Sequence, residues 1–477
     1  MLILLLGVAS LLMIPSLIMA AVLEDPVMIR AFALPMGIVL AGALAAGLLL
    51  LMMKRKNPIR LNTREGFLLV FLAWVFTSLL GSCPYYLAPG GMDFTDAVFE
   101  SACGFATTGA TTLRDVEALS RPLLFWRSMT HWAGGMGIVL LSVALMPLLG
   151  IGGFQLIKAE TPGPEKEKIA PKITAAARSL WLVYCGFTLV LALLYFLGGM
   201  DWFDALCHSF TIMASGGIST KNLGLAYYRS GFIDAVTTVF MILAGLNFNV
   251  YYRLLRGKFR ESFSNSESRA YLLIFLIAAA LVTVSLFPFY GSWGTALRYG
   301  AFQTASILST TGNVIAHYET WPQAAQMVLL CLMFVGGCSS STAGGIKVIR
   351  HVILFKQAGN ELRRIISPQG IFSVRLNKKV GRKDVVYGAA GFIFLYMMGI
   401  VLTTLVSAAS GMDVFSALSA ALAVTGNLGI GFGAVGPFRN YGAFPDYLKW
   451  FFAFVMIAGR LELWTVFVLF TPEYWRR

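Results

Sequence analysis

Long apolar runs recur along the whole of this sequence and constrain the solvent in which it can fold. Each run is about 20 residues long, which is the length an α-helix needs to cross the hydrocarbon core of a bilayer. Charged residues make up only 13% of the 477 positions, and the mean hydropathy is +0.74. A soluble domain would carry about 25% charged residues. The sequence therefore predicts an all-α polytopic membrane protein.

Ten runs of membrane length are present, as two leading runs and four pairs. They are 2–22, 28–53, 65–87, 122–151, 178–198, 231–255, 270–290, 322–356, 384–409 and 446–470. The first run lacks a basic flank and a clear small-residue cleavage site, so we expect a span and not a cleavable signal. An even number of spans predicts that both termini lie on the same side of the membrane.

Basic residues mark that side. The net charge is +14, and most of the 37 lysines and arginines lie in the clusters 54–64, 158–178, 253–269, 347–383 and 476–477. Each cluster follows a hydrophobic pair, as the positive-inside bias of membrane proteins requires. The pattern predicts cytoplasmic termini and argues against nucleic acid as the partner. A docking surface for a soluble partner is a second interpretation of the same clusters, and the two are compatible.

Enzyme motifs are missing from the sequence. The six cysteines show no metal-ligand spacing. The four histidines are scattered, and neither an HExxH motif, a GxSxG elbow nor a phosphate-binding GxxxxGK[ST] loop occurs. We therefore expect no enzyme activity and no cofactor on this chain.

A short apolar run opens the gap inside each of the four pairs. These runs, at 96–106, 204–214, 298–308 and 413–425, are too short to span, so each is re-entrant or interfacial. Each continues into small polar residues and glycine. The first two gaps read DAVFESACGFATTGATT and DALCHSFTIMASGGIST, and both place an aspartate thirteen residues before a glycine. We expect those aspartates, Asp96 and Asp204, to cap the short helices at their N-termini.

The other two gaps follow the same pattern less closely. The third reads FQTASILSTTGNV and brings Gly312 into register with Gly109 and Gly217. The fourth reads SALSAALAVTGNLGIGFG, where counting from Asp413 selects Gly426 but the small-polar pattern selects Gly429. We favour Gly429.

A unit of span, short helix, glycine loop and span is thus used four times. The predicted architecture is two N-terminal spans (1–60) followed by four repeats around a pseudo-fourfold pore, at 61–157, 158–262, 263–366 and 367–477. Backbone carbonyls of four such loops could replace the water around a cation. The alternative for any single loop is an ordinary helix-breaking turn, but four copies in one context favour the pore.

Two further features interrupt the spans. Ten small residues, GGCSSSTAGG at 336–345, split the second span of the third repeat. They indicate either a kinked packing face or a flexible loop that obstructs the path below the pore. Arg460 lies within the last span, where it either forms a structural ion pair or places a charge on the axis as a barrier to cations. We expect Glu100 to hold the loop backbone by hydrogen bonds, and His208, at the matching position, to be structural.

Four long motifs carry a resemblance that covers nearly the whole chain. They are RSMTHWAGGMGIVLLSVALMP, KAETPGPEKEKIAPKI, FVGGCSSSTAGGIKVIR and MIAGRLELWTVFVLFTP. With the two extra N-terminal spans, they resemble the Trk/Ktr/HKT superfamily of potassium transporters, in its bacterial TrkH/TrkG branch.

The resemblance implies a potassium site and a gate. The implied selectivity filter, which holds potassium, comprises Thr107, Thr108, Gly109, Ala110, Ser215, Gly216, Gly217, Ile218, Thr310, Thr311, Gly312, Asn313, Asn427, Leu428, Gly429 and Ile430. The implied gating residues are Gly336, Gly337, Cys338, Ser339, Ser340, Ser341, Thr342, Ala343, Gly344, Gly345 and Arg460. A glycine in all four loops argues against the sodium-selective variants.

The resemblance also implies partners and a location. These are a homodimer, a cytosolic TrkA-type regulatory ring whose RCK domains bind NAD or ATP, and the bacterial inner membrane. The sequence departs from the family where the loop reads CSSSTAGG, where Asn313 stands in place of an aromatic residue, and in GNLGIG at 426–431. These departures bear on gating and fine selectivity. Channel-like potassium uptake is the favoured function. A proton- or sodium-coupled symporter and a non-transporting scaffold are the alternatives.

Overall fold

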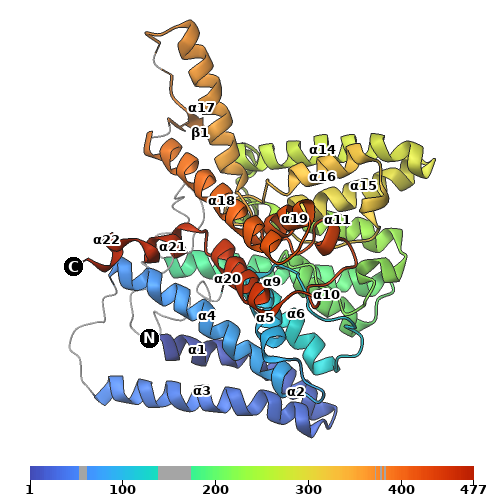
Figure 1. The fold of residues 1–477 in the computed structure, drawn as a ribbon, viewed down its shortest axis with the longest axis vertical. Helices are drawn as coiled ribbons and strands as arrows, with labels where there is room; N and C mark the ends of the chain where they lie inside the picture. The colour runs from blue at the N-terminus through green and yellow to red at the C-terminus, as the bar shows by residue number, and fades with distance from the viewer. Residues whose placement is uncertain (53–61, 138–172, 371, 377–378, 381–382, 477) are drawn as a thin grey trace.

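Apart from two short strands, the structure, a computed structural model, consists of helices and loops in the part of the chain that it describes. It describes residues 1–52, 62–137, 173–370, 372–376, 379–380 and 383–476. The predicted span 122–151 therefore lies partly outside the described residues, as does most of the basic cluster 158–178. The N- and C-termini lie on the same side of the molecule (Figure 1).

The first five helices build the N-terminal edge and the first glycine loop. They are α1 (Leu2–Ser10), α2 (Ile14–Val22), α3 (Pro26–Met52), α4 (Thr63–Leu87) and α5 (Phe94–Ala106), and α6 (Arg121–Gly135) follows. A short 3-10 turn, Leu11–Met13, joins α1 to α2, so together they make one apolar segment of 21 residues.

The next two groups repeat the order of a long helix, a short helix and a second long segment. The second group is α9 (Ile173–Leu197), α10 (Trp202–Met213), α11 (Gly231–Gly245) and α12 (Phe248–Leu255), followed by α13 (Phe259–Phe263). The third group is α14 (Ser266–Tyr290), α15 (Trp293–Leu308), α16 (Gln323–Leu332) and α17 (Val348–Ile366).

A small hairpin leads into the last group. Strands β1 (Arg375–Leu376) and β2 (Lys379–Val380) pair antiparallel beside the projecting helix α17 (Figure 1). The last group is α18 (Lys383–Ala409), α19 (Val414–Thr425), α20 (Asp446–Arg460), α21 (Trp464–Phe467) and α22 (Pro472–Trp475). Short 3-10 turns lie at Gly224–Tyr228, Tyr318–Thr320, Gly433–Val435 and Val468–Phe470.

Six of the predicted runs are unbent helical segments of membrane length: Leu2–Val22, Pro26–Leu49, Arg64–Leu87, Ser179–Leu197, Ser266–Tyr290 and Val385–Ala409. Two others are bent. The run 231–255 turns by 94° between α11 and α12, and 446–470 turns by 109° after α20. Each of these two runs is broken, because Leu246 has an extended backbone and Glu462 has a left-handed one. The predicted interruption at 336–345 is confirmed, since α16 ends at Leu332 and α17 begins at Val348.

In Figure 1 the long helices α14 and α3 lie at opposite edges of the molecule, and the short helices α5, α10, α15 and α19 lie between them. Large apolar side chains of α3, α9, α14 and α18 are exposed, among them Leu48, Leu189, Leu276 and Leu405. In a bilayer these faces contact lipid tails, so exposure there has no hydrophobic cost. The short helices α5, α10, α15 and α19 are largely buried. Helix α10 packs on α6, α15 on α11, and α5 on α20, so each contacts a neighbouring group.

Candidate ion site

The four short helices end in the same backbone geometry. In each glycine loop, the N–H of the second residue donates to the carbonyl five residues earlier. These bonds run from Thr108 to Cys103 (3.0 Å), Gly216 to Thr211 (2.8 Å), Thr311 to Ser306 (2.9 Å) and Leu428 to Ala423 (2.8 Å). The shared hydrogen bond stops each helix at the same point and turns the chain away from its axis.

Two residues of each glycine loop have a left-handed backbone. The first residues are Thr107 (φ 53°), Ser215 (56°), Thr310 (52°) and Asn427 (52°). The third residues are Gly109 (81°), Gly217 (62°), Gly312 (75°) and Gly429 (77°). Gly429, and not Gly426, therefore has the conformation of the other three glycines. Gly426 instead follows the last turn of α19 with a right-handed backbone.

These glycines bring the four loops into a closed ring. A Cβ atom added to any of these glycines would lie within 2.3 Å of a carbonyl oxygen in the next loop, and this oxygen always belongs to the second residue of that loop. The contacts run from Gly109 to Gly216, Gly217 to Thr311, Gly312 to Leu428 and Gly429 to Thr108. Such distances are far inside van der Waals contact, so only glycine allows this approach. Since the last contact returns to the first loop, the loops surround a common axis.

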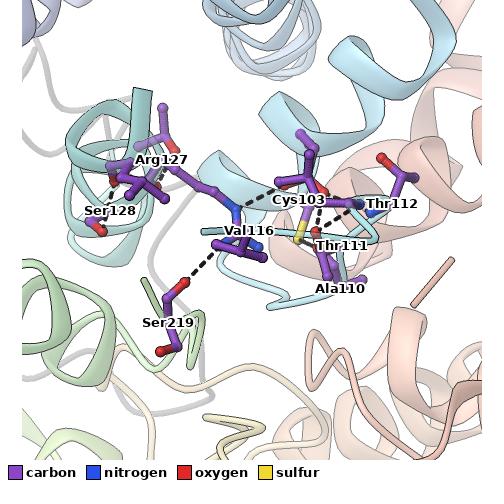
Figure 2. Close-up of polar contacts among 12 residues, drawn as sticks. Cys103, Ala110, Thr111, Thr112, Val116, Arg127, Ser128 and Ser219 are labelled. Atoms are coloured by element: carbon purple, nitrogen blue, oxygen red, sulfur yellow. Dashed lines mark hydrogen bonds and ion pairs between the residues drawn. The ribbon is translucent and has the colours of Figure 1, made fainter. Parts of the chain in front are cut away.

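A buried ion pair supports the first loop (Figure 2). Glu100 on α5 accepts from the backbone N–H of Thr112 (2.7 Å), and its other oxygen accepts from Arg127 Nε on α6 (3.1 Å). Thr111 Oγ1 also donates to Glu100. Arg127 reaches across to the carbonyl of Ser219 after the second loop (3.0 Å). The prediction that Glu100 holds the loop backbone is confirmed.

Side chains of three short helices also fix the residue after the ring glycine. Cys103 Sγ donates to the Ala110 carbonyl at 2.8 Å (Figure 2). Thr211 Oγ1 and Ser306 Oγ make the matching bonds to the Ile218 and Asn313 carbonyls. The fourth helix has Ala423 at this position, and there Tyr441 OH donates to the Gly429 carbonyl (3.0 Å).

The second loop is supported by neutral hydrogen bonds. His208 Nδ1 lies 2.7 Å from the Asp204 carbonyl and Nε2 lies 2.8 Å from Ser219 Oγ. Both ring nitrogens of this buried side chain therefore have structural partners, as predicted.

The expected N-caps are wrong. Asp93 and Asp201 precede α5 and α10, so Asp96 and Asp204 lie inside the first turn. There Asp96 pairs with Lys449 (2.6 Å) and Asp204 with Lys221 (3.1 Å). Sequence spacing identified the acidic first turn but could not locate the first helical residue.

The small-residue loop, residues 336–345, is anchored at its base. The N–H groups of Cys338 and Phe248 bond the carbonyls of Gly245 and Ser340, at 2.8 and 3.0 Å. Buried Glu267 on α14 accepts from the N–H groups of Ser339 (2.6 Å) and Ile349 (3.3 Å). The loop therefore fills the break between α11 and α12.

Arg460 contacts this loop from the opposite side. Its guanidinium donates to the Thr342 carbonyl (2.7 Å) and to the carbonyls of Gly134 and Gly135 at the end of α6 (both 2.8 Å). Its neighbour Glu462 pairs with Arg350 at 2.7 Å. The arginine thus joins the fourth group, the first group and the small-residue loop.

The structure places the predicted residues in two adjacent sets, the ring and the small-residue loop. Sequence reasoning missed Arg127, Glu267 and Tyr441 as supports of these sets. Arg127 and Glu267 carried a usable signal, because ionisable residues at membrane depth generally have a partner or a function. Tyr441 carried none, since tyrosine is common at membrane boundaries.

Fold and site define a class: a multi-pass, all-helical membrane protein with four loops around one axis. Residues 33–477 match the family model TrkH, described as a cation transport protein, and the chain belongs to this family. The family is one of transport proteins, which confirms that the chain is not an enzyme.

Named relatives support the assignment over almost the full length. The chain is 38% identical over 439 residues to the Trk system potassium uptake protein TrkH of Salmonella typhimurium, covering 91% of this chain and 90% of that protein. It is 33% identical to TrkG of Escherichia coli, covering 88% and 87%. The crystal structure of the potassium transporter TrkH from Vibrio parahaemolyticus superimposes with a TM-score of 0.87 at 32% identity, covering 99% and 98%.

Proposed function

We propose that this chain takes up potassium ions through a channel-like, pseudo-fourfold pore. The closed ring of the four glycine loops carries the proposal, because each ring glycine faces the carbonyl of the next loop. Relatives named for potassium uptake cover about nine tenths of the chain, which supports potassium as the cation. The four predicted domains, 61–157 to 367–477, are then four unequal quarters of one pore.

The filter consists of the sixteen residues of the four loops, 107–110, 215–218, 310–313 and 427–430. Carbonyl oxygens there replace the hydration shell of the ion, and no carboxylate is needed among them. The C-terminal ends of α5, α10, α15 and α19 contribute partial negative charge toward the ring. Binding must stay weak enough for ions to leave, which repeated neutral carbonyls allow better than fixed charges.

The small-residue loop is the gate in this proposal. Its buried position and its contacts with the ring residues Ser215 and Thr310 support that role. Arg460 adds a positive charge next to the loop, which opposes cation passage in the closed state. Opening requires the loop to leave its contacts with the ring residues and with Arg460.

The assembly and its location follow the family resemblance. We propose a homodimer in the bacterial inner membrane with both termini in the cytoplasm. A cytosolic ring of the TrkA type, binding NAD or ATP, then regulates the gate. The basic hairpin between α17 and α18 lies on the predicted cytoplasmic side, and its net positive charge suits contact with a soluble partner.

Rubidium flux into proteoliposomes tests the proposal. Purified protein, with and without the regulatory ring, should pass rubidium down its gradient more readily than sodium or lithium. Gly217→Ser should weaken discrimination against sodium, because the added side chain meets the Thr311 carbonyl. No rubidium flux under either condition would contradict the proposal. A reversal potential that follows the proton or sodium gradient would support the coupled symporter instead.

A further inference from the structure

Two hydroxyl groups of the ring contact the small-residue loop directly. Ser215 Oγ lies 2.8 Å from Thr342 Oγ1, and Thr310 Oγ1 accepts from the N–H of Gly344 at 2.6 Å. Both are the first residues of their glycine loops and both have a left-handed backbone. All four groups are buried. The tip of the loop is therefore bonded to the filter region itself.

The equivalent residues of the other two loops have different surroundings. The Thr107 hydroxyl is buried and has no hydrogen-bond partner among the described residues. Asn427 donates to Thr108 Oγ1 (3.0 Å) and to the Met456 carbonyl (2.9 Å). The first residue of the glycine loop therefore bonds the small-residue loop in the second and third groups, through Ser215 and Thr310.

The bonds that hold the small-residue loop differ in strength. Glu267 accepts from the Ser339 N–H at the base of the loop and from the Ile349 N–H in the first turn of α17, and such charge-assisted hydrogen bonds are roughly twice as strong as neutral ones. At the tip, the hydroxyls of Ser215 and Thr310 form neutral bonds. The tip also accepts a charge-assisted bond, from Arg460 to the Thr342 carbonyl (2.7 Å), so its neutral bonds to the ring are the ones suited to reversible release.

We propose that Ser215 and Thr310 are positioning residues that latch the small-residue loop closed, so that loop position and filter geometry change together. The inference rests on the proposed function and deepens it by assigning the closed-state contacts. On opening, both ring residues lose their loop partners and their hydroxyls become free to face the axis. The same side chains then belong to the gate in one state and to the conducting path in the other.

Flux through variants without the regulatory ring tests the latch. Ser215→Ala and Thr342→Val each remove one side of the same hydrogen bond, and each should raise rubidium flux about twofold to tenfold. Thr342 Oγ1 also donates to the Ala244 carbonyl (3.2 Å), so Thr342→Val loses that bond as well, and the double variant should show no more flux than Thr342→Val alone. Thr310→Val should raise flux independently. Thr342→Ser keeps the hydroxyl and should fall between wild type and Thr342→Val.

Ser209→Ala is the matched control. Ser209 is a buried serine on α10, but its hydroxyl donates to the Leu206 carbonyl within the same helix. Its partner-free flux should equal that of the wild type. Wild-type flux in both Ser215→Ala and Thr342→Val would overturn the latch, as would fully additive increases in the double variant.

Chemical labelling separates the latch from the proposed function. Cys338 in the loop is 0% exposed. N-ethylmaleimide should modify it faster in Ser215→Ala and Thr310→Val than in the wild type or Ser209→Ala, as measured by peptide mass spectrometry. Labelling does not depend on ion flux, so it tests the latch even if no rubidium passes. Equal labelling rates in all four proteins would overturn the latch.

Discussion

The first and third glycine loops share a backbone conformation but differ in what lies behind them. Nine residues before each ring glycine stands Glu100 in the first group and Gln303 in the third. Glu100 accepts three hydrogen bonds and pairs with Arg127. Neither amide atom of buried Gln303 has a partner among the described residues. A ring of four similar loops therefore does not need four similar supports.

The difference separates two contributions to the site. The close approach of neighbouring loops sets the backbone shape, and it recurs at all four glycines. The side chains behind the loops vary from an ion pair to a histidine, an unpaired amide and, at Ala420, a methyl group. We expect substitutions of the ring glycines to act alike in every loop, and substitutions of the supports to act unequally.

The largest expected effect is at the ring glycines. Gly109→Ala and Gly312→Ala should each lower potassium over sodium discrimination about tenfold or more, equivalent to ~1.4 kcal/mol. Both add a Cβ against a carbonyl oxygen at a positive φ. Cation-series flux measures the ratio.

Gly388→Ala on α18 is the control for these variants, because nothing lies within 4 Å of the added atom. If Gly312→Ala kept the same potassium over sodium discrimination as Gly388→Ala, the third loop would not contribute to selectivity. The four loops would then not be equivalent.

The supports should differ in their effect on stability. Glu100→Ala leaves Arg127 buried without its carboxylate, so we expect a loss of about 3–5 kcal/mol in the free energy of unfolding. Gln303→Met keeps the volume and breaks no bond among the described residues, so a change below ~1.5 kcal/mol is expected. Denaturant unfolding in detergent gives both values. Equal losses would show that the third loop is supported as firmly as the first.

The starts of the short helices extend the contrast. Asp413 caps α19 by accepting from the Ser416 N–H (3.0 Å), whereas Asp93 before α5 makes no side-chain capping bond. Asp413→Ala should cost about 0.5–2 kcal/mol of stability. Asp93→Ala should cost less, which the same unfolding assay measures. A larger loss at Asp93 would contradict the assignment of these caps.

The smallest effect concerns pH on the outer side of the first loop. A hydrogen bond from Asn222 lowers the pKa of the Asp115 carboxyl below its usual range, and the bond is 2.8 Å long. A lowered folded-state pKa stabilises the protein above the unfolded pKa of ~3.9, and this contribution disappears as pH falls through the folded value.

Wild type and Asn222→Ala should therefore differ more in unfolding midpoint at neutral pH than in strong acid, where only the bond from the Val116 N–H to Asn222 Oδ1 (2.8 Å) still separates them. A difference that grows on acidification would contradict the sign of this pKa shift. Exposed polar pairs contribute little to stability. The effect of Asn222→Ala should therefore be smaller than the effects at the ring glycines, the supports and the helix caps.

The sequence alone determined the features that depend on neighbours along the chain. Apolar runs specified the membrane and six of its spans, and the fourfold recurrence of glycine located all four loops. Ten small residues specified the break before α17. These features are local, because helix length and glycine flexibility act within one segment.

Tertiary structure decided what depends on distant segments. Gly429 was favoured from the sequence, but its close approach to the Thr108 carbonyl of the neighbouring loop shows its equivalence to the other glycines. The pairing of Glu100 with Arg127 and the bonds from Ser215 and Thr310 to the small-residue loop likewise join separate groups. The bends after Gly245 and Arg460 accommodate that loop and its contacts. No pattern along the chain encodes which groups become neighbours, because ring closure depends on packing among all four.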